Sequence, residues 1–211
     1  EEYKAKFFIN YLDSTNALVY SYIAQEGSDV IDPVAEEKEL LKEIELTPDT
    51  EDIRYSYDGW RSLPTNIDRS HTIRVKEKIE YRVQFFAADQ DETAHETQWI
   101  ESGYPAEDPS SRAENPFIPI KTATGQYTFT FANWNQDITT ILSPLSCYPV
   151  FEEALNTYVV QFFAGEKKLG EDQIVAWGHS PNFPAEPVYK YYWDTKTSDY
   201  KYFEVYEHID W

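Results

Sequence analysis

A six-residue pattern occurs three times in the sequence, and this repetition limits the folds that the chain can adopt. The copies are YKAKFF at residues 3–8, YRVQFF at residues 81–86 and YVVQFF at residues 158–163. In each copy a tyrosine, a small apolar residue and a phenylalanine occupy alternate positions, so they would point to one face of a β-strand. The starts of the copies are almost evenly spaced along the chain, which predicts tandem copies of one small domain.

The same marker residues follow in each copy, in the same order. A proline comes six residues after a glycine, and a tryptophan follows that glycine at a nearly constant distance. An isoleucine follows the first two tryptophans at a distance of seven residues. We therefore predict three repeats, at residues 1–79, 80–156 and 157–211. Their markers are Gly27, Pro33, Trp60 and Ile67, then Gly103, Pro109, Trp134 and Ile141, and finally Gly178, Pro184 and Trp211.

An aromatic strand leads to the tryptophan, at residues 55–60 and, as YTFTFANW, at residues 127–134. Together with the opening strand, the glycine turn and closing strands near 71–76 and 146–151, it resembles the Listeria–Bacteroides repeat, the internalin-type B-repeat. The resemblance covers nearly the whole chain, although the segments between glycine and tryptophan are longer than is usual in that family. It implies a small β-grasp-like module of extracellular stalks, adhesins and phage virion proteins, without catalytic residues.

The expected fold is therefore mostly β with short helices (α+β), as three tandem β-grasp-like modules in a rod-like array. The first repeat would begin with a hairpin of strands 3–9 and 17–23 around a turn-rich loop. Strands 54–57 and 73–75 would complete it. Trp60 and Trp134 occupy equivalent positions, and periodic aromatic residues are mostly core residues, so both are expected to be buried.

Asp32 followed by Pro33 is typical of a helix start, because aspartate caps free N–H groups and proline suits the first turn. A short helix at residues 35–46 would place three apolar side chains on one face, those of Leu40, Leu41 and Ile44. The second repeat has the same signal at Asp108 and Pro109. Later prolines there allow only a single helical turn near residues 110–114.

The second repeat would open with a hairpin from residue 81 to residue 103, around a loop at residues 88–91. The third repeat would have a tighter hairpin that turns at residues 165–169. Short segments at 77–80 and 152–157 contain no glycine or serine, and we interpret them as linkers that make the array semi-rigid.

The third repeat ends at its tryptophan, Trp211, so we expect it to lack the closing strand. Either the natural chain continues, or a neighbouring chain supplies a strand by β-augmentation. A second alignment takes Trp193 as the equivalent tryptophan and residues 200–206 as the closing strand, which would make the module complete.

Composition restricts the partners and the chemistry. The formal net charge is −20, from 38 acidic and 18 basic residues, which disfavours nucleic acid and anionic membranes as partners. Cys147 is the only cysteine, so no disulfide forms within the chain. No apolar run is long enough to insert in a membrane.

Motifs for catalysis or cofactor binding are absent from the sequence. The four histidines, at positions 71, 95, 179 and 208, lack the spacing of metal ligands. The loop at residues 89–93 starts like a calcium loop, but Ala94 and Ile100 stand where glycine and glutamate are needed. We therefore predict no enzyme activity, no catalytic residues, no cofactor and no metal site.

These features predict a non-enzymatic structural or display protein on an extracellular surface. The first setting is a phage virion appendage or capsid decoration, and the alternative is a bacterial cell-surface adhesin stalk or ligand-binding fragment. In either setting the expected partners are proteins of a larger assembly, with host-surface carbohydrate or protein as a further candidate.

Overall fold

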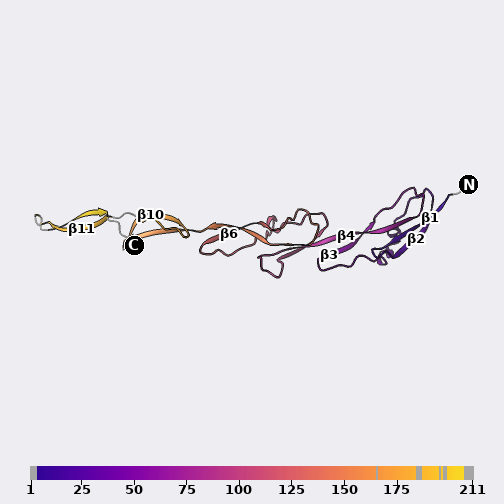
Figure 1. Ribbon diagram of the computed structural model, residues 1–211, viewed down its shortest axis with the longest axis horizontal. Coiled ribbons are helices and arrows are strands. Elements are labelled where there is room, and N and C mark those ends of the chain that lie inside the picture. Colours follow the sequence, from indigo (N-terminus) through magenta and orange to yellow (C-terminus); the bar gives the residue numbers. More distant parts are fainter. Residues whose placement is uncertain (1–3, 165, 184–186, 195, 197–198, 207–211) are drawn as a thin grey trace. The chain divides into compact units, whose positions relative to one another are not determined.

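Strands dominate the computed structural model, which describes residues 4–164, 166–183, 187–194, 196 and 199–206 (Figure 1). Contacts divide the chain into two compact units, one of residues 1–119 and 131–150 and one of residues 120–130 and 151–211. Helical residues in the described part are confined to α1 (Pro33–Glu36), η1 (Lys38–Lys42) and η2 (Pro109–Ser111). The expectation of a mostly β chain with short helices is confirmed, and the three repeat boundaries stay a prediction.

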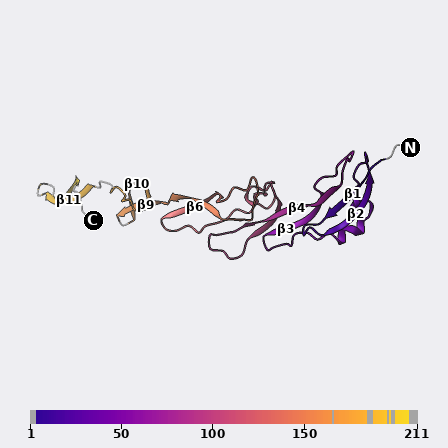
Figure 2. The same cartoon turned by 45° about the vertical axis from the view of Figure 1, so that its right-hand side comes forward.

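Strand β4 (His71–Phe85) is the centre of the sheet in the first unit. One edge of β4 pairs with β1 (Lys6–Leu12) in parallel and with β5 (Glu96–Glu101) in antiparallel orientation. The other edge pairs with β3 (Ile53–Trp60) in antiparallel and with β7 (Leu145–Cys147) in parallel orientation. The outermost strand, β2 (Leu18–Gln25), pairs with β1. Figure 2 shows β3 and β4 side by side.

The predicted linker at residues 77–80 is wrong, because these residues lie inside β4. Glu77, Lys78 and Glu80 are paired with residues of β3, and Glu80 is paired with Glu101 of β5 as well. A polar segment can be part of a strand when neighbouring strands form hydrogen bonds with its backbone on both edges and one of its faces is exposed to water. Strand β4 therefore closes the first repeat and opens the second.

The second predicted linker, at residues 152–157, is wrong for the same reason. Strand β8 (Pro149–Leu155) and strand β9 (Thr157–Ala164) leave only Asn156 between them. Strand β6 (Tyr127–Trp134) has the predicted bounds and is the neighbour of β8.

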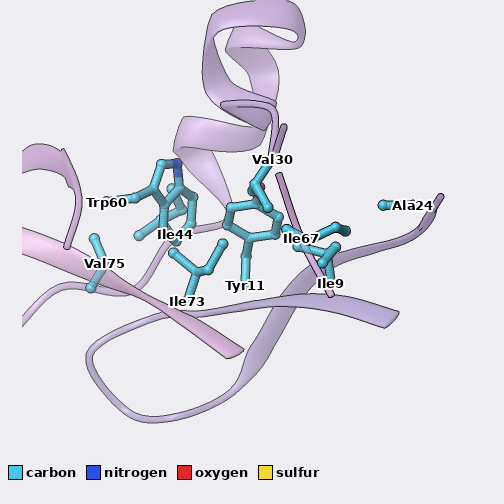
Figure 3. Close-up of a cluster of buried hydrophobic side chains, with 9 residues drawn as sticks. All are labelled: Ile9, Tyr11, Ala24, Val30, Ile44, Trp60, Ile67, Ile73 and Val75. Atoms are coloured by element: carbon cyan, nitrogen blue, oxygen red, sulfur yellow. The ribbon is translucent and has the colours of Figure 1, made fainter. Parts of the chain in front are cut away.

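The first hydrophobic core forms around Tyr11 and Trp60, whose rings meet edge to face with centroids 4.7 Å apart. Figure 3 shows Tyr11 in the middle of this cluster, with side chains from strands and loops around it. The other buried members are Ile9, Ala24, Val30, Ile44, Ile67, Ile73 and Val75.

The second core repeats this arrangement around Phe85 and Trp134, whose rings also meet edge to face at 4.9 Å. Its other buried members are Val83, Ala106, Ile141 and Cys147. Trp60 is 7% exposed and Trp134 is 5% exposed, so the expected burial of both tryptophans is confirmed.

One aspartate in each core accepts the indole N–H of the tryptophan. Trp60 Nε1 donates to Asp32 Oδ1 at 3.1 Å, and Trp134 Nε1 donates to Asp108 Oδ1 at 2.9 Å. The same carboxylates cap the helical turns, as predicted. Burial opposes ionisation of Asp108, but hydrogen bonds from Trp134 and Ser110 outweigh it, so the pKa of Asp108 lies below its usual value.

The predicted helix over residues 35–46 is wrong in length. Asp32 Oδ1 accepts from Val34 N at 3.0 Å, and the helix that it caps ends at Glu36, after which η1 begins. Leu40 and Ile44 are buried, but Leu41 is 44% exposed, because 3₁₀ geometry turns it away from the core. In the second repeat, η2 is the single turn that was predicted, placed at the proline itself.

The structure aligns the opening strands of the first two repeats differently from the six-residue pattern. In parallel pairing Ile9 lies opposite His71, and Val83 lies opposite Leu145. Ile9 is therefore equivalent to Val83, and Tyr11 is equivalent to Phe85. The first copy is displaced by four residues from the predicted alignment. An even displacement keeps every side chain on its face, so the alternation alone does not detect it.

The glycine of each marker set turns the chain so that it bonds to the marker isoleucine. Gly27 N donates to Ile67 O at 2.9 Å, and Gly103 N donates to Ile141 O at 2.8 Å. Both glycines have positive φ, of 79° and 89°, where side chains with a Cβ are strained. Both isoleucines are buried, as their repetition suggests.

The second unit contains two hairpins. Strand β9 pairs with β10 (Lys167–Ala176), and β11 (Pro187–Asp194) pairs with β12 (Asp199–Tyr206). The predicted turn over residues 165–169 is too long, because residues 167–169 belong to β10. Trp211 and the surroundings of the Trp193 side chain lie outside the described residues, so the two alignments of the third repeat stay predictions.

Asp108→Ala is expected to lower the free energy of unfolding by about 2–4 kcal/mol, because it removes a cap and leaves a buried indole N–H without its acceptor. Asp108→Asn keeps an oxygen at the cap and is expected to cost less. Chemical denaturation followed by tryptophan fluorescence measures both losses. Equal losses for the two variants, or no loss for alanine, would contradict this role of Asp108.

Tyr57→Phe is expected to stabilise the chain by about 1 kcal/mol, because the buried Tyr57 hydroxyl has no hydrogen-bond partner in the described part of the chain. Phe131 is the equivalent residue, and both rings lie edge to face against their tryptophan. Urea denaturation at neutral pH tests this expectation, with Tyr55→Phe as the control. A clear destabilisation by Tyr57→Phe alone would show that the hydroxyl has a partner.

The same variant should change the response to alkali. Burial and the nearby Asp32 carboxylate raise the pKa of Tyr57 to about 12 from its usual 10.0. The folded state holds this proton more tightly than the unfolded state, so stability is lost as the pH rises from about 10 to about 12. Tyr57→Phe should lose less stability across this interval. Identical pH dependence of the two proteins would contradict the raised pKa.

Candidate functional site

Histidines do not gather at a common site in the structure. His71 lies on β4, and His95 stacks on Phe117 with ring centroids 3.5 Å apart. His179 lies in the turn after β10, and His208 is outside the described residues. Within the described ranges, no three His, Cys, Asp or Glu side chains are grouped as a metal site would require. The described helices are also too short to cross a membrane.

The acidic loop at residues 89–93 is held by its own hydrogen bonds. Ala88 N donates to Asp91 Oδ2 at 2.9 Å, so this carboxylate stabilises a turn. Cys147 is fully buried in the second core, and burial raises the pKa of its thiol to about 11. A buried neutral thiol is a poor nucleophile, so its position indicates a packing role.

A hollow lies beside β10, lined by residues that include Ile174, His179 and Asn182. Its volume is ≈ 280 Å³ and it is open to solvent. Ligand pockets usually measure about 300–1,000 Å³ and enclose most of their ligand. This hollow is therefore a weak candidate for binding a small molecule.

A glutamine on the second strand of two hairpins clamps the loop that follows. Gln98 Nε2 donates to Glu107 O at 2.8 Å, while Gln98 Oε1 accepts from Glu107 N at 3.0 Å. Gln173 makes the same two bonds to Asn182. In both cases the clamped residue lies nine positions later, two residues before the marker proline. The clamp satisfies both backbone groups of that residue and ties the loop to the hairpin.

Two tyrosines replace this clamp in the first repeat. Ile31 N donates to the Tyr22 hydroxyl at 3.1 Å, and the Tyr11 hydroxyl donates to Ile31 O. Tyr22 lies opposite Ile9, as Gln98 lies opposite Val83, so the two positions are equivalent. The spacing of nine residues recurs in all three copies and is a signal that the sequence analysis misses. This spacing is hard to recognise because the first repeat has a tyrosine where the other two have a glutamine.

An arginine adds a second tie between loop and strand in the second repeat. Arg112 Nη1 donates to Glu96 Oε2 at 2.6 Å, and Arg112 Nη2 donates to Glu107 Oε2 at 2.9 Å. The hydrogen bonds from Arg112 hold the pKa of Glu96 below its usual value. The pair therefore favours the folded loop at neutral pH and loses this contribution as Glu96 becomes protonated in acid.

Apolar residues on the outward face of two hairpins form exposed cross-strand pairs. Phe8 lies opposite Ile23, and Val159 lies opposite Ile174. All four side chains are more than half exposed. Exposed apolar pairs on a sheet surface are candidate contacts for a protein partner or for the apolar face of a sugar. Periodic aromatic residues are expected to be mostly core residues, and Phe8 is an exception.

The equivalent pair in the second repeat is covered. Arg82 lies opposite Trp99, and the Arg54 guanidinium lies over the Trp99 ring, 3.7 Å from its centroid. Arg82 in turn forms ion pairs with Glu51 and Asp52 of the first repeat. Side chains of the preceding repeat therefore occupy this outward position at the junction.

Comparisons with known proteins give little further evidence. No protein-family model matches the chain. No curated protein matches it. Among solved structures, the chain is similar to domains 3–4 of Streptococcal High Identity Repeats in Tandem (SHIRT) from a cell surface protein, with 11% identity over 72% of this chain and 99% of that chain. The TM-score of 0.23 is too low to define a shared fold. The resemblance to Listeria–Bacteroides repeats therefore stays a prediction.

Proposed function

We propose that this chain is a non-enzymatic structural protein of tandem repeats that is displayed on an extracellular surface. The observation that carries the proposal is the shared strand β4, which completes the sheet around the first core and begins the sheet around the second. A protein that must hold successive modules in a fixed direction needs junctions of this kind. Independent binding modules on flexible linkers do not.

Hydrogen bonds on both edges of β4 support a stiff junction. Glu80 and Tyr81 pair with β3 on one edge and with β5 on the other. Next to this overlap, Arg82 N donates to Asp52 O at 2.9 Å, and Ser102 N donates to Ile79 O at 2.8 Å. Bending at the junction would break several of these bonds at once, so the repeats are coupled through their backbone.

Side chains strengthen the same junction on its outward face. Arg82 pairs with Glu51 at 3.1 Å and with Asp52 at 2.5 Å. Arg54 of β3 covers Trp99 of β5. Exposed ion pairs contribute little individually, but a network that spans two repeats resists their separation.

Two settings fit a stiff, acidic array. The first is a phage virion appendage or capsid decoration, and the second is a bacterial cell-surface stalk that carries or forms an adhesin. Both need spacing elements that stay soluble, and a net charge of −20 supports that property. The expected partners are proteins of the assembly and host-surface protein or carbohydrate, with no nucleic acid and no membrane insertion.

Small-angle scattering of the full chain tests the array. A compact protein of 211 residues has a radius of gyration of about 17 Å, and a rod-like array should exceed this value clearly. A short Gly-Ser insertion after Lys78 should make the particle flexible, because it interrupts β4. The same insertion after Asp89, in the loop between β4 and β5, is the matched control and should change little. A compact particle, or equal effects of the two insertions, would contradict the proposal.

Antibody labelling tests the location. Antibodies against the full chain should label intact cells or intact virions without permeabilisation, and which of the two they label distinguishes the settings. Labelling that requires permeabilised cells would exclude display on a surface.

A further inference from the structure

The three opening hairpins have the same register. Tyr22, Gln98 and Gln173 make the equivalent loop clamps. The residues opposite them are Ile9 on β1, Val83 on β4 and Val160 on β9, respectively. Val160 of β9 is therefore equivalent to Ile9 and Val83. The turns after the hairpins agree as well, because Glu26 N, Ser102 N and Trp177 N donate to Ala5 O, Ile79 O and Asn156 O.

In two of the three cases a parallel strand fills the other edge of the opening strand. Strand β4 lies on β1, with His71 opposite Ile9, and β7 lies on β4, with Leu145 opposite Val83. As far as the structure describes the chain, β9 pairs with β10 alone. Ile9 and Val83 are fully buried, whereas Val160 is only partly buried. Among the described residues, the equivalent edge of β9 is thus open.

Two counts along the sequence give the same register for a strand that would fill this edge. His71 follows its partner Ile9 by the same number of residues as Leu145 follows its partner Val83. Counted from Val160, that number leads to 222. The offset from Trp60 to His71 likewise equals the offset from Trp134 to Leu145. Counted from Trp211, which the first of the two alignments takes as the equivalent tryptophan, that second offset gives the number 222 again.

We propose that the edge of β9 at Val160–Phe162 is an acceptor site for a parallel β-strand, whose occupant is a closing strand of the kind that fills the edges of β1 and β4, with its equivalent of His71 and Leu145 opposite Val160. Its chemistry follows from the two filled edges, His-Thr-Ile-Arg-Val at residues 71–75 and Leu-Ser-Cys at residues 145–147, in which residues facing the core alternate with outward ones. The backbone supplies hydrogen bonds, and the alternating apolar side chains cover Val160 and Phe162.

A second copy of the chain is a poorer occupant of this edge. Two β9 edges that meet around a two-fold axis perpendicular to the sheet pair antiparallel, whereas both filled edges are parallel. Two copies with a net charge of −20 each also repel one another. A strand that is supplied in parallel orientation meets neither obstacle.

A chain extended at its C-terminus tests the site. A second copy of residues 61–78 added after Trp211 places the copied His71 at position 222. Hydrogen exchange should then slow at least tenfold at the amides of β9 that face the open edge, relative to the unextended chain. In a control extension the copied Thr72 and Ile73 trade places, and so do the copied Arg74 and Val75. The composition stays the same, but the apolar side chains point to the other face. It should give no such protection.

Substitutions in β9 form the matched pair on the acceptor side. Val160→Lys should remove the protection that the extension gives, because this side chain lies on the core-facing side. Val159→Lys, on the outward side, should keep it. Exchange at the β10 amides checks that the hairpin itself stays folded in both variants.

Absence of added protection in the extended chain, or equal protection by the control extension, would overturn the proposal. The unextended chain, followed over a range of concentrations by sedimentation, tests the rival occupant. A dimer whose formation protects the β9 edge would assign the site to a second copy and would also overturn the proposal. Both outcomes are independent of the stiffness test at Lys78, so failure of one proposal is distinguishable from failure of the other.

Discussion

The hydrogen bond from a buried indole to a capping carboxylate is the contact on which the first two repeats depend. The carboxylate of Asp108 accepts from Trp134 and from Ser110, so one side chain fixes both the aromatic strand and the start of the loop. The tryptophan packs edge to face on an aromatic residue of the opening strand, which lies beside the closing strand. Removal of the carboxylate would therefore loosen three elements that are far apart in the sequence.

The third repeat replaces this contact. Phe183 stands where the other repeats have Asp32 and Asp108, and it packs on Phe162 with ring centroids 5.2 Å apart. Phe162 is equivalent to Tyr11 and Phe85, the residues that contact the tryptophans of the first two cores. An apolar contact thus takes the position of a charge-assisted hydrogen bond, while the glutamine clamp beside it is kept.

Much of the fold could be predicted from features that leave few alternatives. A glycine with positive φ, an Asp-Pro pair and a strand of alternating aromatic residues each correspond to one local conformation, and Gly27, Asp108 and β6 were predicted correctly. Other features have no local signature. The displacement of the first strand leaves every side chain on the same face of the strand, so the alternation does not reveal it. The polar residues of β4 resemble a linker until their partners on β3 and β5 are known. The outward pairs depend on that same register, so they could not be identified beforehand.

The shared strand has a consequence for how such an array can evolve. The predicted repeat boundary before residue 80 divides a strand of 15 residues, so the predicted sequence unit and the folded unit are out of phase. A duplicated segment that begins in the middle of β4 brings the second half of one strand and the first half of the next. Recombination in the same phase at this junction rejoins these halves into a whole strand, so a copy can be gained or lost there without a new junction.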